Sequence, residues 1–241
     1  MRLLVTRPEP EGGRTAARLR ARGHQVRLVP LLRIEPVANV RLGAGPWAAM
    51  LATSANACRV LAAHESLADL VALPVFAVGG RTAAAARAAG FPEAEAAGGN
   101  MRELAERLRA WVREEPARRE PLLYLAGEDR SGDLAAALAA TGQSVTTVVV
   151  YRAIKADKFP PAAAAALSAG RIEGVLHFSR RSAEAYIDCA RVGGILAPAL
   201  AVTHFCLSAA IAEPLLASGA KRTRIAPRPE EAALLALVEA G

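Results

Sequence analysis

Two stretches of this chain repeat one local pattern, and this repeat constrains the fold more than any other feature of the sequence. Residues 2–33 and residues 121–152 each contain an apolar run, a polar segment, an Ala- and Leu-rich segment, a small turn and a second apolar run. Gly23 and Gly142 hold the same place in the two copies, shortly before the second run. This order predicts strand, helix and strand in each copy.

A second unit also occurs twice, once after each copy of the first. Its copies begin with MLATSANACRVLAA and VLHFSRRSAEAYID, in which Ser54 and Ser179 end a predicted strand and open a predicted helix. Further along, Thr82 and Ser208 hold equivalent positions. Strands and helices therefore alternate throughout the chain, and such alternation is typical of parallel α/β sheets.

The predicted strands are short runs rich in Val, Leu and Ala. Between most of them lie segments with apolar residues three and four apart, such as residues 14–22, and this spacing predicts amphipathic helices. The strands are expected at Arg2–Thr6, Gln25–Pro30, Ala48–Thr53, Val75–Val78, Glu93–Ala96, Leu122–Ala126, Val145–Tyr151, Gly174–Phe178, Leu200–Thr203 and Arg222–Ala226.

The order of the units leaves two ways to build domains. Tandem domains would each join a first unit to the second unit that follows it. The runs VRLVPLLRIEPV (26–37) and VTTVVVYRAIKA (145–156) instead look like a paired connector, because both are long and β-rich. We therefore expect two flavodoxin-like open parallel-sheet lobes joined by a two-stranded β connector, with the chain crossing between the lobes. The expected bounds are 1–34 plus 157–241 for one lobe, 38–147 for the other, and 35–37 with 148–156 for the connector.

The charge of the chain has two interpretations. The net charge is +7, with 27 Arg against 3 Lys. Arg suits carboxylate or phosphate partners because its planar fork binds them in a bidentate way, but an excess of Arg and Ala also reflects a GC-rich genome. No run of five basic residues occurs and aromatic residues make up only 4% of the chain, which argues against nucleic-acid binding.

The expected cellular compartment is inferred from the lack of a predicted membrane span and of a signal-peptide pattern. No charge-free apolar stretch of about 18 residues predicts a membrane span, and the start of the chain lacks the pattern of a signal peptide. The cysteines Cys58, Cys189 and Cys206 are odd in number and show no CxxC spacing, so we expect free, mostly buried thiols in a reducing compartment. The protein is expected to be cytoplasmic.

Several familiar catalytic patterns are absent. The sequence contains no GxxxxGK[ST] loop, no GxGxxG with an acidic partner and no GxSxG elbow. His204 and Cys206 lie close in sequence, but no further His or Cys cluster completes a metal site. We expect His177 and His204 to be packing residues.

The candidate site residues follow the carboxyl ends of the predicted strands, where open α/β sheets bind ligands. Ser54, Thr82, Ser179 and Ser208 look like helix N-caps, and capping alone would explain them; helix starts that face one site would also hold carboxylates. Five arginines occupy similar loops, where each is either solvated or a carboxylate clamp: Arg7, Arg81, Arg130, Arg180 and Arg181. Tyr151 ends an apolar run, so it is either a packing residue or a phenol that donates a hydrogen bond.

The order and spacing of these motifs resemble the uroporphyrinogen-III synthase family, and within it the bacterial branch. The resemblance spans nearly the whole chain. Its motifs are VTRP (Val5–Pro8), VxxxPLLxI (Val26–Ile34), TSxNAxR (Thr53–Arg59), AVGxxTAxAxxxxG (Ala77–Gly90), LYLAGEDRSGDL (Leu123–Leu134), VVVYRA (Val148–Ala153) and FSRRSA (Phe178–Ala183).

The resemblance implies a lyase that cyclises hydroxymethylbilane, a linear tetrapyrrole with eight carboxylates, to uroporphyrinogen III. Water is lost and ring D is inverted through a spiro intermediate, without metal or organic cofactor. Tyr151 matches the family tyrosine that helps the hydroxyl leave. The implied substrate-binding residues are Arg7, Ser54, Asn56, Gly80, Arg81, Thr82, Arg130, Ser131, Ser179, Arg180, Arg181, Ser182 and Ser208. We also expect a monomer, transient contact with the preceding pathway enzyme, and neither nucleic-acid nor membrane partners.

One departure from the family pattern weakens part of this set. The second copy reads VTHFCLSAA where the family usually has a glycine, so Phe205 and Cys206 narrow the approach to Ser208. Two other classes of function remain open. The chain could be a non-catalytic, two-lobed tetrapyrrole-binding relative, or an Arg-rich nucleic-acid-binding protein whose affinity falls steeply with salt.

Overall fold

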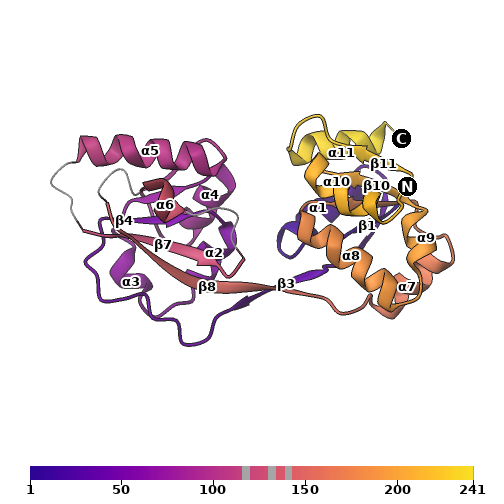
Figure 1. Ribbon diagram of the computed structural model, residues 1–241, viewed down its shortest axis with the longest axis horizontal. Coiled ribbons are helices and arrows are strands. Elements are labelled where there is room, and N and C mark those ends of the chain that lie inside the picture. The colour runs from indigo at the N-terminus through magenta and orange to yellow at the C-terminus, as the bar shows by residue number, and fades with distance from the viewer. Residues whose placement is uncertain (116–119, 130–133, 139–142, 241) are drawn as a thin grey trace. The chain divides into compact units, whose positions relative to one another are not determined.

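The chain forms two compact units, which are described separately. The computed structural model describes residues 1–115, 120–129, 134–138 and 143–240. Met1–Arg33 and Ile154–Gly241 together form one unit, called here the terminal unit, and Ile34–Ala153 forms the other, the middle unit (Figure 1).

The terminal unit is built on a five-stranded parallel sheet with the strand order β11-β10-β9-β1-β2. The central strand pair joins segments that are far apart in the sequence, since Leu3 of β1 lies in register with Gly174 of β9. The strands are β1 (Arg2–Val5), β2 (Gln25–Leu28), β9 (Gly174–His177), β10 (Thr203–Cys206) and β11 (Thr223–Ile225).

Helices cover both faces of this sheet because its strands are apolar on both sides. Leu3 and Val5 pack with Leu234 in one buried cluster, while Leu4, between them in the sequence, packs with Tyr186 in another. This alternation follows the two-residue period of a strand. The helices are α1 (Glu11–Arg20), α7 (Pro161–Ser168), α8 (Arg180–Val192), α9 (Leu196–Leu200), α10 (Ala209–Ala217) and α11 (Glu231–Glu239).

The middle unit contains a six-stranded sheet with the order β3-β8-β7-β4-β5-β6. The pairs β8–β7, β7–β4, β4–β5 and β5–β6 are parallel. The edge strand β3 and its neighbour β8 both continue across the boundary between the two units. The strands are β3 (Leu32–Pro36), β4 (Ala49–Ala52), β5 (Val75–Ala77), β6 (Ala94–Ala96), β7 (Leu122–Gly127) and β8 (Val145–Lys155).

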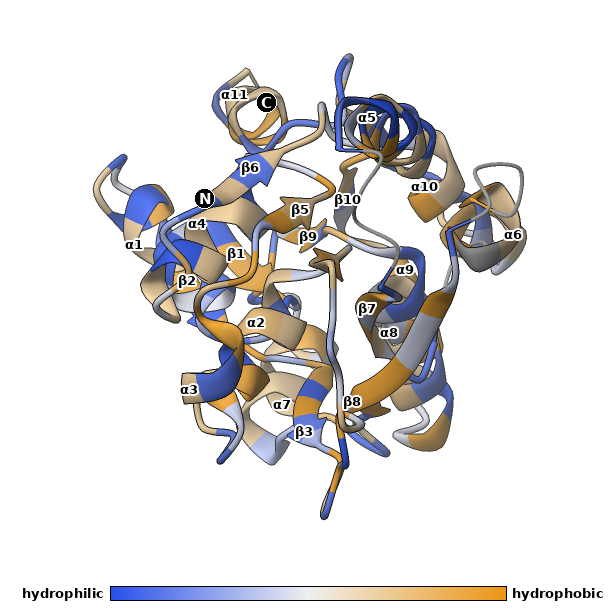
Figure 2. Cartoon of the chain, turned by 90° about the vertical axis from the view of Figure 1, so that its left-hand side faces the viewer, coloured by the Kyte–Doolittle hydropathy of each residue, from blue (hydrophilic) through white to orange (hydrophobic). Residues whose placement is uncertain are grey.

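Helices also pack on both faces of the middle sheet. Met50 and Leu123 belong to one buried cluster, and Leu51 and Tyr124 belong to the cluster on the other face, with Trp111 of α5. Figure 2 shows the contrast between hydrophobic β5 and α5, which carries many hydrophilic residues. The helices are α2 (Ala55–Leu61), α3 (Leu67–Leu70), α4 (Gly80–Ala88), α5 (Met101–Glu114) and α6 (Leu134–Leu138).

Two mostly parallel α/β sheets are what the alternation of strands and helices predicts, and this prediction is confirmed. Gly90 and Gly219 hold equivalent places in the two copies of the second sequence repeat. Both adopt positive φ (104° and 101°) directly after a helix. A glycine there ends the helix without the strain that a Cβ would add. The two copies therefore use the same residue type at the same helix end.

One predicted strand is wrong. The expected strand Leu200–Thr203 contains instead the end of α9, and β10 begins only at Thr203. The short helix packs against α8, where the hydroxyl of Tyr186 donates to the carbonyl of Ala199 at 2.9 Å. Of the expected strand, Leu200 lies in the helix, Ala201 is the C-cap of the helix and Thr203 begins β10. The run 26–37 is likewise split into β2 and β3 around Pro30, which has no N–H to donate to a sheet.

The strand order changes direction at one point in each sheet. In the terminal unit this switch lies between β1 and β9, and in the middle unit between β4 and β7. Ligands of open α/β sheets bind beyond the carboxyl ends of the strands at such a switch. A ligand site is therefore expected at one of these two switch points.

Candidate active site

The switch point of the middle unit opens into a polar cavity of about 410 Å³. Its walls come from the segments that follow β4, β5 and β7, from β7 and β8 themselves, and from the start of α5. The lining residues are Thr53, Ser54, Val78, Gly99, Asn100, Met101, Tyr124, Gly127, Asp129 and Tyr151. All of them belong to the middle unit.

Tyr151 reaches this cavity because of an irregularity in the sheet. Ala126 of β7 is in register with Val149 of β8, but the next residue, Gly127, is in register with Tyr151, so Val150 is the extra residue of a bulge. The backbone N–H of Glu128 donates to the carbonyl of Tyr151 at 2.9 Å and closes the bulge. A bulge re-aims a side chain, and here it sets the phenol of Tyr151 over Gly127.

A second phenol lines the same cavity. The hydroxyl of Tyr124, on β7, lies 2.9 Å from Oγ1 of Thr53, which follows β4. Only 3% of Tyr124 is exposed, and its ring packs in the buried cluster that contains Leu51 and Trp111. The cavity therefore has two tyrosine hydroxyls and one threonine hydroxyl at the switch point.

The start of α5 forms another wall. Oδ1 of Asn100 accepts a hydrogen bond from the backbone N–H of Glu103 at 3.0 Å and caps the helix. Gly99 lies against Gly79, since a Cβ on Gly79 would be 3.4 Å from the Cα of Gly99. The N-terminal end of a helix this long carries partial positive charge and favours carboxylates.

The residues predicted from the sequence fall in different places in the middle unit. Ser54 and Tyr151 line the cavity. Ser54 also caps α2, because its Oγ accepts the N–H of Asn56 at 3.2 Å, while Oδ1 of Asn56 accepts from Arg59 at 2.9 Å. The exposed Gly80 and Arg81 are the first two residues of α4. Arg130 and Ser131 lie outside the described residues.

The expectation that Thr82 is a helix N-cap is wrong. The cap of α4 is Gly79 in extended conformation, so Thr82 is the third residue inside the helix and is buried. Glycine at the cap lets the helix start earlier than the hydroxyl pattern suggests. The backbone carbonyl of Thr82 also accepts a hydrogen bond from the thiol of Cys58 at 3.9 Å.

Sequence reasoning missed Tyr124, Asn100 and Asp129. Tyr124 lies inside a quoted motif, LYLAGED, but an apolar run gives no sign that one ring ends in a cavity. Asn100 carried a usable signal, because Gly-Gly-Asn before an amphipathic helix is a typical cap pattern. Asp129 lies in the same motif as Tyr124, and nothing in the sequence distinguishes it from its neighbour Glu128.

The switch point of the terminal unit is occupied by its own side chains. Nη1 of Arg7 lies 3.2 Å from Oγ1 of Thr15 and 3.2 Å from Oε2 of Glu231, and its guanidinium stacks on the ring of Phe178 at 4.3 Å. Oγ1 of Thr15 donates to the same carboxylate at 2.7 Å. Arg7 is buried. An internal carboxylate therefore already takes the place where a substrate carboxylate was expected.

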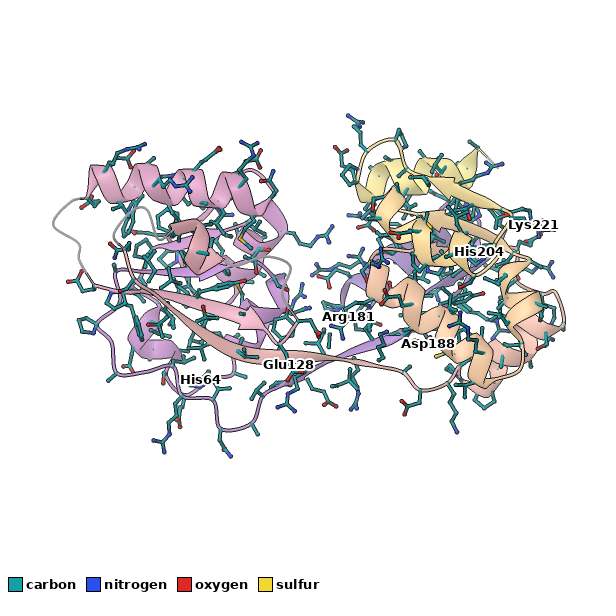
Figure 3. The ribbon with its side chains drawn as sticks, in the orientation of Figure 1. His64, Glu128, Arg181, Asp188, His204 and Lys221 are labelled. Atoms are coloured by element: carbon teal, nitrogen blue, oxygen red, sulfur yellow. The ribbon has the colours of Figure 1, made fainter. Side chains whose placement is uncertain are left out.

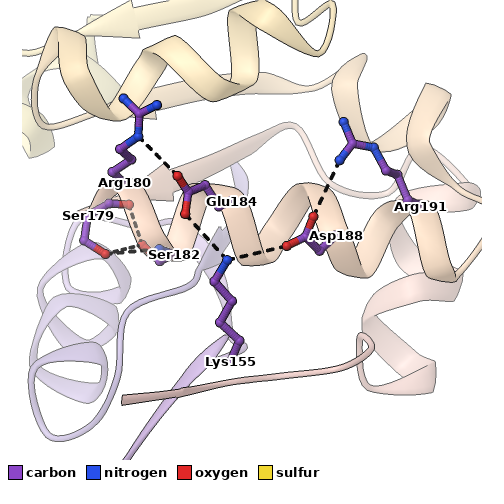
Figure 4. Close-up of polar contacts among 7 residues, drawn as sticks. All are labelled: Lys155, Ser179, Arg180, Ser182, Glu184, Asp188 and Arg191. Carbon is purple, nitrogen blue, oxygen red and sulfur yellow. Dashed lines mark hydrogen bonds and ion pairs between the residues drawn. The ribbon is translucent and has the colours of Figure 1, made fainter. Parts of the chain in front are cut away.

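The start of α8 shows capping as the sequence predicts. Oγ of Ser179 accepts the backbone N–H of Ser182 at 3.1 Å, and Oγ of Ser182 donates to the carbonyl of Ser179 at 2.9 Å (Figure 4). Ser182 is fully buried. Its hydroxyl thus serves the helix start and reaches no solvent.

The neighbouring arginines differ in their surroundings. Arg180 pairs with Glu184 on its own helix (Figure 4). It also pairs with Glu213 on α10, and the hydrogen bond to Glu213 raises the pKa of the guanidinium. The half-buried Arg181 follows it at the start of α8 (Figure 3). Ser208 caps α10 with its backbone only, because its side chain makes no capping hydrogen bond.

His177 and His204 are packing residues, as expected, and they form one buried pair. Nε2 of His177 lies 3.1 Å from Nδ1 of His204, and both rings lie edge-on to Tyr186. Burial lowers the pKa of His177 well below the ordinary value and lowers that of His204 to about 4. Both imidazoles are therefore neutral near pH 7.

The cysteines are free and buried, as expected. Burial raises the pKa of the Cys58 and Cys189 thiols to about 11 and that of Cys206 to about 12, so none is a thiolate nucleophile at neutral pH. Within the described part of the chain, no group of three or more His, Cys, Asp or Glu side chains is placed to hold a metal ion. No described helix is long and apolar enough to cross a membrane.

Two doubly wound α/β sheets, with a polar cavity at one switch point, place the chain in the class of open-sheet α/β proteins. A family model described as "Uroporphyrinogen-III synthase HemD" matches residues 13–236. The chain belongs to the uroporphyrinogen-III synthase family. A search of curated proteins found no match.

Solved structures agree on the fold. A uroporphyrinogen-III synthetase from Helicobacter pylori superimposes with a TM-score of 0.67 at 19% identity, covering 100% of this chain and 99% of that one. A mutant uroporphyrinogen III synthase from Thermus thermophilus gives a TM-score of 0.52 at 19% identity, covering 100% of this chain and 98% of that one. At this identity the similarity concerns the fold.

Proposed function

We propose that this chain is the lyase that cyclises hydroxymethylbilane to uroporphyrinogen III. The family model supports this function across nearly the whole chain. The structural observation that carries it is the cavity at the middle-unit switch point, where Tyr151 is held over Gly127 by a bulge in the sheet.

Tyr151 is proposed as the proton donor to the departing hydroxyl. The C–O bond of the hydroxymethyl group breaks as the pyrrole nitrogen supplies electrons, and a phenol proton completes the leaving water. A tyrosine phenol has an ordinary pKa near 10, so it carries that proton at neutral pH. The azafulvenium that remains is attacked by the substituted α-carbon of ring D.

The following steps need positioning more than acid or base strength. The spiro intermediate fragments and closes again with ring D reversed. The ring D carbon that forms the last bond then gives its proton to the phenolate, and ring D becomes aromatic again. The net change is loss of one water. The linear bilane also closes without inversion, so the protein must favour one attack geometry, which proximity and orientation supply.

The substrate carboxylates are proposed to meet the hydroxyls and arginines predicted from the sequence. Ser54, which lines the cavity, and Arg81 at the start of α4 are the best placed in the middle unit. In the terminal unit, Arg181 and Ser208 are partly exposed, whereas Arg7 would first have to leave Glu231. Helix starts add N–H donors that favour anionic groups.

The proposal also covers the organisation of the enzyme. The terminal and middle units would be its two flavodoxin-like lobes, with β3 and β8 as the connector. We further propose a cytoplasmic monomer that receives bilane through transient contact with the preceding pathway enzyme. Sedimentation of the purified protein, alone and with that enzyme, tests both the monomer and the contact.

Isomer analysis of the product tests the function. Purified protein is incubated with freshly generated bilane, the product is oxidised, and the type I and type III porphyrins are separated by chromatography. Type III product is expected to dominate and to increase with the amount of protein. Type I alone, as in a control without protein, would refute catalysis and favour a non-catalytic tetrapyrrole-binding relative.

A further inference from the structure

Tyr124 and Thr53 form a hydroxyl pair whose only described hydrogen bond is the one between them. Their oxygens lie 2.9 Å apart, and both residues line the cavity that contains Tyr151. The pair lies at the β4–β7 switch point, because Thr53 follows β4 and Tyr124 is on β7. It therefore sits where an open α/β sheet meets its ligand.

The different burial of the two residues favours one direction of this hydrogen bond. Tyr124 is 3% exposed, and among the described residues its hydroxyl has Thr53 as its hydrogen-bond partner. Either oxygen could donate in this hydrogen bond, but a buried phenol O–H needs an acceptor, and this need favours Oγ1 of Thr53 as the acceptor. Thr53 is only half-buried, so its own O–H remains to point into the cavity.

The ring of Tyr124 is fixed by the core. It packs in the buried cluster with Leu51, Leu104 and Trp111, which lie on β4 and α5. A ring held in this way keeps its hydroxyl in one place, and Thr53 is held in turn. A hydroxyl that accepts one hydrogen bond also becomes a better donor of another.

We propose that Tyr124 is a positioning residue that orients Thr53, so that the Thr53 hydroxyl donates a hydrogen bond to an oxygen of the bilane. That oxygen belongs either to a carboxylate or to the departing hydroxyl. This inference rests on the proposed function, because it names the bilane as the acceptor. It adds the Thr53 hydroxyl to the groups proposed to contact the bilane, and it gives the buried phenol of Tyr124 a role different from that of Tyr151.

A double-mutant cycle tests the inference. Tyr124→Phe removes the phenol oxygen and keeps the ring, and Thr53→Val removes the threonine hydroxyl at constant volume. Each single change is expected to lower kcat/KM for type III formation by about three- to tenfold, as loss of one hydrogen bond does. The double variant is expected to match Thr53→Val alone, because Tyr124 acts only through Thr53.

Thr53→Ser separates positioning from a merely structural role. Serine keeps a hydroxyl at the same place, so adding Tyr124→Phe to the Thr53→Ser variant should still reduce kcat/KM, whereas adding it to the Thr53→Val variant should not. A structural role of the phenol predicts the same loss in both backgrounds. Equal losses, or no loss on Tyr124→Phe in the natural chain, would overturn the inference.

The split between kcat and KM identifies the acceptor oxygen. A carboxylate acceptor predicts that Thr53→Val mainly raises KM, whereas the departing hydroxyl predicts that it mainly lowers kcat. The two failures are distinct. If the unmodified enzyme makes no type III product, the proposed function fails; if it does and the two losses multiply in the double variant, only the role of Tyr124 fails.

Discussion

Gly127 and Tyr151 are register partners on neighbouring parallel strands, and the phenol of Tyr151 lies in the space that a side chain on Gly127 would fill. A Cβ at position 127 would lie 2.7 Å from Cζ and 2.8 Å from the hydroxyl oxygen of Tyr151. Real Cβ atoms essentially never approach other atoms this closely. The glycine therefore defines where the phenol sits.

Gly127→Ala is expected to displace the Tyr151 ring and slow type III formation at least several-fold. The added methyl group occupies the position of the ring edge, so the ring must rotate or the bulge must shift. Rates and isomer ratios measured on the single variants and on Gly127→Ala/Tyr151→Phe check the cause. A double variant much slower than either single one would show that Gly127 acts by another route.

Tyr151→Phe is expected to lower the rate of type III formation at least several-fold while leaving thermal unfolding unchanged. The change removes the proposed proton donor, and the ring still packs beside the cluster around Val150. Steady-state assays and melting curves measure the two properties. Unchanged turnover would refute the role of Tyr151 but not the family.

Tyr186→Phe is the matched control for that variant. Its hydroxyl is buried in the terminal unit and donates to the carbonyl of Ala199 at 2.9 Å. Losing this hydrogen bond leaves the buried carbonyl of Ala199 without its donor, and is expected to reduce the free energy of unfolding by about 1 kcal/mol. The catalytic rate of the folded protein should stay the same.

The strand–helix alternation was enough to predict two parallel α/β sheets, because apolar periodicity reports directly on burial. It failed at Leu200, because a short apolar run does not distinguish the end of a helix from the start of a strand. The site was harder to predict. Tyr151 was a candidate from its position, but the bulge that aims it depends on Gly127 across the sheet.

Hydrogen bonds and ion pairs between side chains far apart in the sequence were also not predictable. Arg7 follows a strand, as an arginine that binds a substrate carboxylate would. Its guanidinium instead pairs with Glu231, over two hundred residues later in the chain. Tyr124 looks like one more apolar residue of a central strand until its hydroxyl is seen against Thr53. Both relationships join segments that no local pattern connects.

Glu231→Ala is expected to reduce the free energy of unfolding by about 3 kcal/mol or more, since it removes one partner of a buried ion pair and also the partner of Arg18 at 3.5 Å. The side chains of Arg7 and Glu231 are 9% and 15% exposed, and Thr15 also loses its acceptor. Urea unfolding at pH 7 measures the loss. The first residue of α11 would thus matter more to stability than any exposed ion pair.

Glu239→Ala provides the comparison on the same helix. Glu239 pairs with Arg22 at 2.8 Å, but both side chains are more than 40% exposed. Such pairs contribute about 0–1 kcal/mol. Similar losses for the two variants would show that burial of the Arg7–Glu231 pair adds nothing.

The buried His177–His204 pair is expected to make stability fall with acid. Both pKa values are lower in the folded protein than the ordinary 6.5, and that of His204 is about 4. Between these values the unfolded chain binds more protons than the folded one, so the free energy of unfolding decreases as the pH falls. Each histidine contributes at most about 1.4 kcal/mol per pH unit in that window. Above pH 6.5 the pair adds no pH dependence.

A variant with His177→Gln and His204→Asn isolates this effect. Its two amides are hydrogen-bonding groups that do not titrate. Urea unfolding of both proteins between pH 4 and pH 7 should give a steeper decline for the natural chain, beginning near pH 6.5 where the unfolded histidines gain protons. Parallel curves would mean that the buried imidazoles are already protonated in the folded state, or that the loss in acid comes from carboxylates elsewhere in the chain.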